Sequence, residues 1–272
     1  MWYEAPELVV PLTGPGPAEV RLRAFHDGER LFLLAEWEDP AVSLNRYWKL
    51  QEGGDWVRHF GEDGFAVLWV PGSLAEEFRA QGCAISCHGA THRRDGPRGY
   101  FDVWSWGAQR SSQFGQAIDM VLDFGNGGRL RGDGQPAESG NLPNENSQFR
   151  GPAAVPLRVT EESARFLRWS NAQPLPLERY EATKHTSVGW EVPYDLLRAG
   201  KGSRGDVAAA GYHAEGRWRL EMSRLFRTGN GDDEPLGDPL VPSRFAVAVH
   251  EAAEGGDHAI SGPIELRCVA TR

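Results

Sequence analysis

The sequence lacks long apolar runs, is poor in cysteine and shows no concentration of basic residues. Its longest apolar run, residues 65–70 of 272, is only of strand length, whereas a membrane-spanning helix requires about 18 or more consecutive apolar residues. We therefore expect no membrane span in this chain. The first residues, Met1 to Tyr3, lead directly into polar and proline-rich sequence, which does not show the charged start and apolar centre of a secretory signal.

Basic residues are outnumbered by acidic ones and scattered along the chain. There are 29 Lys and Arg against 38 Asp and Glu, a formal net charge of −9, which argues against nucleic acids and anionic membrane surfaces as partners. The sequence also contains no P-loop, no nucleophile elbow and no His-Glu-x-x-His pattern. These absences leave a hydrolase or another conventional enzyme with little support.

Two of the three cysteines stand next to a histidine. Residues 83–88 read Cys-Ala-Ile-Ser-Cys-His, and a cysteine pair followed at once by histidine is typical of covalent haem attachment. The thiols of Cys83 and Cys87 can each add to a haem vinyl group, and the imidazole of His88 can bind the iron. The usual motif has two residues between the cysteines, and this one has three. The motif predicts one covalently bound haem c.

The same residues leave two other interpretations open. Cys83, Cys87, His88 and His92 could bind zinc, although closed zinc sites normally take their ligands from separated pairs. The two thiols could also be plain or redox-active, because a disulfide that closes so small a ring would be strained. The third cysteine, Cys268, lies in an apolar stretch and is expected to be a buried small side chain.

Short apolar or alternating stretches separated by turn residues predict a β protein. The stretch 20–37 alternates on both sides of Asp27-Gly28, a strong signal for a β-hairpin. Residues 65–70 predict a buried strand, and Ser73 to Glu76 form a capping box for a short helix. The cysteine motif is therefore expected in a loop just beyond a helix.

The second half of the chain returns to strands, expected at residues 157–160, 166–169, 187–192, 207–213, 217–225, 245–249 and 264–269. Only Pro193 to Ala199 predicts another helix, because proline stands near its start and Gly200 follows its end. The Gly- and Asn-rich segment 125–152 is expected to be a long irregular loop. We predict a mainly β protein, an antiparallel β-sandwich with a few short helical insertions, folded as a single haem-binding domain over residues 1–272.

Several separated segments carry a family resemblance. They are residues 20–28 and 35–40, Glu62-Asp63, residues 82–88, Asp102 to Trp106, Arg224-Leu225 with Thr228-Gly229, and residues 245–249. In this order they resemble the haem-binding domain family that includes the γ subunit of ethylbenzene dehydrogenase and related subunits of dimethyl-sulfoxide-reductase-type molybdenum enzymes. The resemblance covers most of the chain, from about residue 19 to 268.

The resemblance implies a β-sandwich that holds one haem near the ends of its strands and moves electrons rather than transforming a substrate. In members with a non-covalent haem, a methionine and a lysine bind the iron, and the lysine follows a Gly-Gly-x turn after the penultimate strand. The corresponding residues here are Gly255-Gly256-Asp257-His258. The resemblance therefore implies His258 as one axial ligand and His88 as the other, which departs from the methionine–lysine pair.

Other side chains could also meet the haem. Trp104 and Trp106 are candidates for packing against the porphyrin, although a place in the protein core suits them equally well. Met222 alternates with Leu220 on an expected strand and is assigned to the core. The remaining histidines, with His26 at a turn, have no context that distinguishes them as ligands.

These residues predict a monohaem c-type cytochrome domain, not itself an enzyme. It would relay single electrons between a quinol-linked or periplasmic donor and a terminal oxidoreductase, and a molybdenum enzyme is a candidate for the complex to which it belongs. Covalent haem attachment in bacteria requires export, so we expect the periplasm or the outer face of the cytoplasmic membrane. The alternatives are a haem-based ligand-binding or sensing module, with His88 as the only permanent ligand, and a zinc-binding structural domain.

Overall fold

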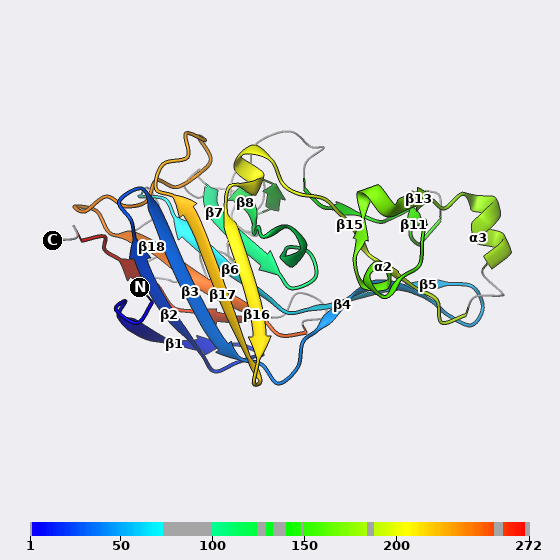
Figure 1. Ribbon diagram of the computed structural model, residues 1–272, viewed down its shortest axis with the longest axis horizontal. Helices are drawn as coiled ribbons and strands as arrows, with labels where there is room; N and C mark the ends of the chain where they lie inside the picture. The colour runs from blue at the N-terminus through cyan, green and yellow to red at the C-terminus, as the bar shows by residue number, and fades with distance from the viewer. Residues whose placement is uncertain are drawn as a thin grey trace, which may run out of the picture.

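The protein is mainly β and consists of a larger curled sheet and a smaller lobe that extends from one end of it (Figure 1). The computed structural model describes residues 2–72, 100–123, 129–132, 140–147, 149–183, 188–252 and 258–269. Both chain ends lie on the larger part, away from the lobe. Among the described residues no helix has the length and apolar character needed to cross a membrane.

The larger part is a twelve-stranded sheet in which neighbouring strands pair antiparallel. Its strands follow in the order β16 (Ala208–Ala214), β17 (Arg217–Leu225), β3 (Arg30–Glu38), β2 (Glu19–His26), β1 (Glu7–Thr13), β19 (Ala259–Ser261), β18 (Ser243–His250), β6 (Gly64–Val70), β7 (Tyr100–Gly107), β8 (Ile118–Asp123) and β9 (Arg129–Gly132), with β20 (Ile264–Leu266) beside β18.

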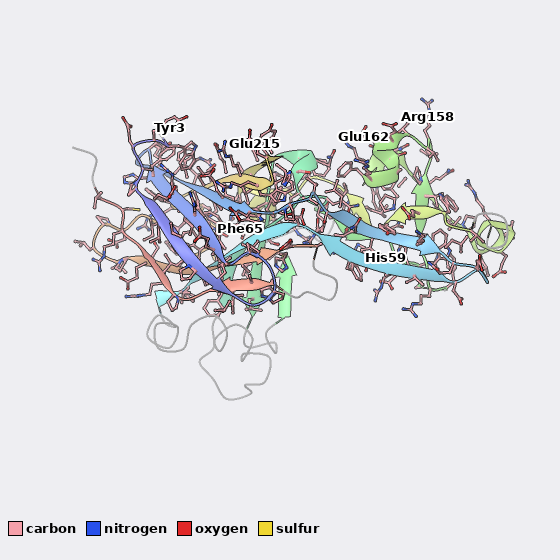
Figure 2. All side chains as sticks on the ribbon, turned by 90° about the horizontal axis from the view of Figure 1, so that it is seen from below. Tyr3, His59, Phe65, Arg158, Glu162 and Glu215 are labelled. Atoms are coloured by element: carbon pink, nitrogen blue, oxygen red, sulfur yellow. The ribbon has the colours of Figure 1, made fainter. Side chains whose placement is uncertain are left out.

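The sheet curls so that its two halves pack face to face around one core. On β3 alternate residues such as Leu33 and Trp37 point inward, and on β6 Phe65 and Trp69 do so. The rings of Trp37 and Phe65 stack across the core with centroids 5.5 Å apart, and Phe65 is labelled within the sandwich in Figure 2. Each such buried side chain stabilises the fold by about 1.5–3 kcal/mol. The predicted antiparallel β-sandwich is confirmed.

The expected hairpin is present as β2 and β3. Gly28 has a φ of 102°, in the left-handed region that glycine adopts without steric cost. The Oδ1 atom of Asp27 accepts hydrogen bonds from the backbone N–H groups of Glu29 and Arg30, at 3.0 and 2.8 Å. The two residues of the turn therefore supply both its conformation and its side-chain bonds, as the sequence indicated.

The smaller lobe has short sheets and a core of its own. Its strands are β14 (Glu191–Pro193), β4 (Leu44–Leu50) and β5 (Trp56–Glu62) in one sheet, β10 (Leu142–Pro143), β15 (Asp195–Leu197) and β12 (Leu167–Arg168) in a second, and β11 (Ala154–Pro156) with β13 (Ala172–Pro174) in a third. Two helices, α2 (Glu161–Arg165) and α3 (Leu177–Thr183), and the 3-10 turn η5 (Trp169–Asn171) complete it. The core gathers around Trp48, Trp56 and Tyr194.

Buried ion pairs mark the junction between the lobe and the sandwich. The Nε atom of Arg46 lies 2.7 Å from Oδ2 of Asp195 and 3.3 Å from Oε1 of Glu62. Glu62 also accepts hydrogen bonds from the side chain of Arg110 and from the backbone N–H of Gln109. In Figure 2, His59 and Glu162 are labelled on the lobe side of this junction.

The sequence predicted the elements of the lobe poorly. The helix expected over residues 193–199 is wrong, because this stretch forms the end of β14 and then β15. Leu196 and Leu197 are both buried there, one pairing with β10 and both with β12, so tertiary packing overrides the helix signals. The strand expected over residues 157–160 is displaced to β11, and Thr160 instead caps α2. The segment 125–152 is not wholly irregular, since it contains β9 and β10.

The expected single domain over residues 1–272 stays a prediction. The second hydrophobic core of the lobe was not foreseen in the sequence, because its strands of two or three residues are too short to show a period.

Candidate functional site

The cysteine motif lies outside the described residues. Cys83, Cys87 and His88, together with the short helix expected before them, belong to the stretch between β6 and β7. The described chain ends at Gly72 and resumes at Tyr100, and Trp69 pairs with Asp102 on the neighbouring strand. Both ends of the stretch are therefore at the same end of the sandwich.

The sheet has an apolar outer face, which we define as the face of β18, β6, β7 and β8 turned away from the sandwich core. Because Phe65, Val67 and Trp69 point into the core, the residues between them point outward. A cluster of six buried side chains forms on this outer face, separate from the main core: Leu68, Val70, Phe101, Val103, Leu122 and Ala246. The sheet thus carries apolar side chains on both faces.

Two histidines lie side by side at the other end of this outer face. Val249 and Ala259 are fully buried in the main core, so strand alternation places His250 and His258 on the outer face. Their ring centroids are 4.7 Å apart. Next to them, the small side chains of Ala66 and Ala248 pair across β6 and β18 and are only partly buried. The outer face therefore carries two imidazole rings beside strand residues with small side chains.

Burial controls the protonation of one of the two histidines. Burial, together with the positive charges of His258 and Arg110, lowers the pKa of His250 to about 4. At neutral pH the imidazole of His250 is therefore uncharged. Sequence analysis found no context for this residue, because its nearness to His258 arises from the pairing of β18 with β19.

Trp104 and Trp106 lie on the inner side of the sheet. Both are almost fully buried in the main core. The ring of Trp104 lies 5.1 Å from that of Trp69, and the ring of Trp106 lies 5.1 Å from that of Trp218. The structure therefore does not bring these indoles together with His258, which is on the opposite face. They are core residues, the alternative that the sequence left open, and their porphyrin contact stays a prediction.

A second polar centre lies inside the sandwich, around Arg224 on β17. The guanidinium is fully buried, and its Nη1 atom lies 2.7 Å from Oδ2 of Asp102, 3.2 Å from Oδ2 of Asp119 and 3.5 Å from Oδ1 of Asp233. Its Nη2 atom donates a hydrogen bond of 2.8 Å to the carbonyl of Glu234. The guanidinium carbon also lies 5.0 Å from the centre of the Trp104 ring.

Burial raises the pKa values of three carboxyl groups in and beside this centre, those of Asp102, Asp206 and Glu234. The pKa of Asp102 rises to about 6, although the charge of Arg224 acts against the rise. The pKa of Asp206 also rises to about 6, through burial and the negative charge of Asp233. Burial and the charge of Asp102 raise the pKa of Glu234 to about 7. This centre was not predicted from the sequence, although aspartates within otherwise apolar strands were a signal for it.

The structure also places three other residues that the sequence analysis considered, Met222, His26 and Cys268. Met222 is 1% exposed and lies in the main core, as expected. His26 lies at the end of β2, where its Nε2 is 2.9 Å from the carbonyl oxygen of Val269. Cys268 is a buried free thiol, which confirms its assignment as a buried small side chain.

Fold and site together define a β-sandwich protein with polar groups grouped at the outer face and inside the sandwich. Residues 5–260 match the model of the family described as ethylbenzene dehydrogenase. Because this match covers most of the chain, the protein belongs to the ethylbenzene dehydrogenase family. The resemblance inferred from the order of the sequence segments is thereby confirmed. No curated protein sequence matches the chain.

Solved structures resemble the chain only distantly. A carbohydrate-binding module of family 9 from Caldicellulosiruptor kristjanssonii, in complex with cellotriose, has a TM-score of 0.35 at 8% identity, covering 99% of this chain and 86% of that one. The same kind of module in complex with glucose has a TM-score of 0.37 at 8% identity, covering 100% and 88%. The family assignment therefore depends on the family match alone.

Proposed function

We propose that this chain is a non-catalytic, electron-transferring subunit of an oxidoreductase complex and that it holds one haem c. In the proposal Cys83 and Cys87 bind the porphyrin covalently, and His88 and His258 occupy the two axial positions of the iron. Membership of the ethylbenzene dehydrogenase family supports a place in an oxidoreductase complex. The observation that carries the haem assignment is the Cys-x-x-x-Cys-His motif.

The position of His258 fits this assignment. It lies on the outer face, beside the small side chains of Ala66 and Ala248, where a planar group can approach the strands closely. The apolar cluster around Leu68 and Val103 continues the same face. Apolar surroundings suit a porphyrin, because they exclude water from the iron and tune its potential.

The chain is long enough to bring the two proposed ligands together. His258 and Val70 are at opposite ends of the outer face, separated by the length of β6, which is about 20 Å at a rise of roughly 3.3 Å per residue. His88 follows Val70 by 18 residues and precedes Tyr100 by 12. Extended segments of these lengths span roughly 60 and 40 Å. Both connecting segments are therefore long enough for the covalent motif to reach the histidine pair.

A bound haem supplies one-electron chemistry, because its iron cycles between two oxidation states. The protein's own part is to fill both axial positions, so that no substrate or gas binds there, and to keep the surroundings apolar. His250 is neutral beside His258, so it adds no positive charge next to the ligand. We further propose that the protein is located in the periplasm. There it would receive electrons from a quinol-linked or periplasmic donor and pass them to the catalytic subunit of the complex, a molybdenum enzyme.

The decisive experiment is a pyridine haemochrome spectrum together with an intact mass, on protein exported and matured in a host competent for c-type cytochromes. We expect a c-type spectrum and a mass increase of one haem, with both lost in Cys83→Ser/Cys87→Ser. Cys268→Ser is the matched control and retains both. Colourless protein with thiols at 83 and 87 open to alkylation would contradict the proposal, and zinc found in that protein would support the zinc alternative. Carbon monoxide binding to the reduced wild type would favour the sensing alternative.

A further inference from the structure

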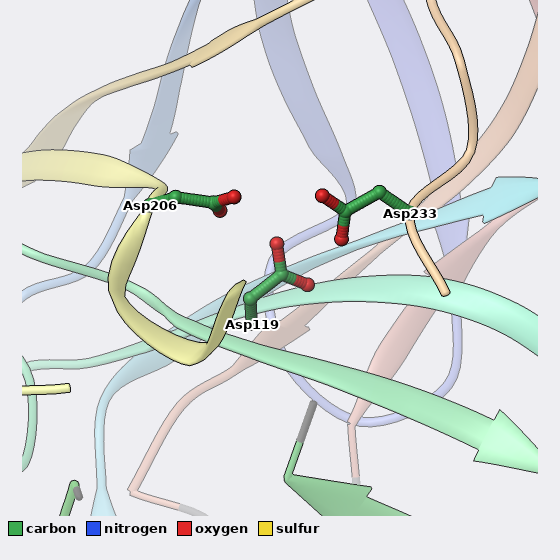
Figure 3. A group of neighbouring side chains, drawn as sticks. All are labelled: Asp119, Asp206 and Asp233. Atoms are coloured by element: carbon green, nitrogen blue, oxygen red, sulfur yellow. The ribbon is translucent and has the colours of Figure 1, made fainter. Parts of the chain in front are cut away.

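Three aspartates from distant parts of the chain meet inside the sandwich. Asp119 belongs to β8, Asp206 follows the 3-10 turn η6 (Gly202–Gly205), and Asp233 lies between β17 and β18. One carboxylate oxygen of each lies within 4.8 Å of those of the other two. Figure 3 shows the three carboxyl groups turned toward one common space. This convergence is produced by the tertiary fold and has no counterpart in the sequence spacing.

The centre holds more negative than positive charge. Asp102, Asp119 and Asp233 lie around the guanidinium of Arg224, which is closest to Asp102, and Asp206 lies beside Asp119 and Asp233. Ionised, these four carboxylates leave an excess of three negative charges in a largely buried region. Like charges that are withdrawn from water repel one another strongly. Either protons or a bound cation must therefore compensate this excess.

An unpartnered atom points to a cation. The side chain of Asp119 is fully buried, and its Oδ2 accepts a hydrogen bond from Arg224. Its Oδ1 has no hydrogen-bond partner among the described residues, and neither has Oδ1 of Asp206. Buried carboxylate oxygens almost always have a donor or an ion as partner. In Figure 3 the carboxylate of Asp119 is directed into the space between Asp206 and Asp233.

The side-chain amide of Asn230 donates hydrogen bonds to Oδ2 of Asp206 and to Oδ2 of Asp233, at 3.1 and 3.2 Å. The atoms of this group that can bind a cation are oxygens. Besides the three carboxylates, the hydroxyl groups of Ser203 and Thr228 hydrogen-bond to Asp233. Calcium is bound by six to eight oxygens at about 2.3–2.6 Å, so that ligands on opposite sides of the ion lie about 5 Å apart. Zinc and the later transition metals prefer nitrogen and sulfur ligands. No histidine or cysteine among the described residues belongs to this group.

We propose that Asp119, Asp206 and Asp233 bind a calcium ion. The ion offsets two of the three excess negative charges around Arg224 and ties β8, η6 and the segment between β17 and β18 to one another. Asp102, at the start of β7, shares Arg224 with this group and stands where the chain re-enters the sheet after the cysteine motif. The calcium site is independent of the haem assignment, and its test does not use the haem.

The test measures calcium binding by the full chain after removal of metal with a chelator. Titration calorimetry with calcium chloride is expected to show one site, and calcium at about 100 times its Kd is expected to raise Tm by about 5–10 °C. Asp206→Asn is the informative variant, because Asp206 is only partly buried and is not a close partner of Arg224. It removes one repelling charge, so the metal-free variant is expected to melt at or above the Tm of the metal-free wild type.

The calcium response should depend on this carboxylate. We expect Asp206→Asn to lose both the binding heat and the Tm rise. Asp238→Asn is the matched control, since Asp238 is an exposed aspartate of the same segment as Asp233, and it should respond as the wild type does. The proposal is overturned if metal-free wild type neither binds calcium nor gains stability from it, or if Asp206→Asn responds equally. Protons alone would then neutralise the centre.

Discussion

His250 and His258 are neighbours on the outer face, with ring centroids 4.7 Å apart, yet the proposal gives an iron-binding role only to His258. The family resemblance places the ligand after the Gly-Gly-x turn, and His258 follows that turn. His250 belongs instead to β18, where burial lowers its pKa to about 4. The two residues therefore allow a matched comparison at one location.

Replacing each histidine separately tests which of them binds iron. In His258→Ala we expect loss of the six-coordinate low-spin bands and the appearance of carbon monoxide binding, because one axial position opens. In His250→Gln we expect the low-spin bands to remain. Absorption spectra of both redox states, with and without carbon monoxide, provide the measurement. The opposite pattern, with bands lost only in His250→Gln, would transfer the axial role to His250.

Arg224 is the residue on which the stability of the inner polar centre depends most. Its removal leaves Asp102 and Asp119 buried without their cation, and an uncompensated buried charge costs about 3–5 kcal/mol. We expect Arg224→Met to lower the free energy of unfolding by about this amount in urea denaturation. Arg219→Met on the same strand is the control, because the side chain of Arg219, which pairs with Glu36, is 63% exposed, and a solvent-exposed ion pair contributes less than about 1 kcal/mol. Equal losses in the two variants would contradict this role.

At the scale of elements, β16 packs closely against β7 through a glycine. A Cβ atom on Gly211 would lie 2.3 Å from Cζ2 of Trp106, and Trp106 is held by the core. We expect Gly211→Ala to lower the free energy of unfolding by about 1–3 kcal/mol, as overpacking commonly does. Gly231→Ala is the control, since nothing lies within 4 Å of its Cβ position. Thermal unfolding of both variants measures the difference, and an unchanged Tm in Gly211→Ala would show that the indole moves aside freely.

Elements that the sequence predicted well carry their own local signals. The hairpin of β2 and β3 has alternation on both sides of Asp27-Gly28, and β17 was predicted with the bounds that the structure shows. The wrong helix at residues 193–199 shows the opposite case. Proline and glycine commonly stand at the ends of helices, but here the stretch between them pairs with β10 and β12 in the lobe. Strands of two or three residues are too short to show an alternation of apolar and polar residues, and their position depends on the strands with which they pair.

At the scale of the whole molecule, the inner polar centre makes stability depend on pH. Asp102 and Asp206 have pKa values raised to about 6, and Glu234 to about 7. Between about pH 4 and 7 the folded protein therefore binds more protons than the unfolded chain, so the contribution of these groups to the free energy of unfolding falls as pH rises. His250 acts in the opposite direction, because its pKa of about 4 lies below the unfolded value of 6.5.

The difference between wild type and Asp206→Asn isolates this effect. In metal-free buffer the ionised carboxylate of Asp206 destabilises the folded wild type, and the variant lacks this carboxylate. We therefore expect the free energy of unfolding of the variant to increase relative to that of the wild type as pH rises from 5.5 to 7.5. Urea denaturation at both pH values measures the change, and Asp238→Asn should run parallel to the wild type. Parallel profiles for wild type and Asp206→Asn would show that Asp206 does not titrate in this window.

The sequence by itself determined the class of fold and the family. The cysteine–histidine motif predicted haem attachment at Cys83 and Cys87 and an iron ligand at His88, and the family resemblance implied His258. Strand alternation, turn residues and the motif could be read directly, because they are local patterns. Only the tertiary structure decided that His250 lies beside His258, that Trp104 and Trp106 occupy the opposite face, and that three aspartates surround Arg224. Contacts of this kind join strands that are distant in the chain, and the pairing of strands, rather than residue spacing, brings them together.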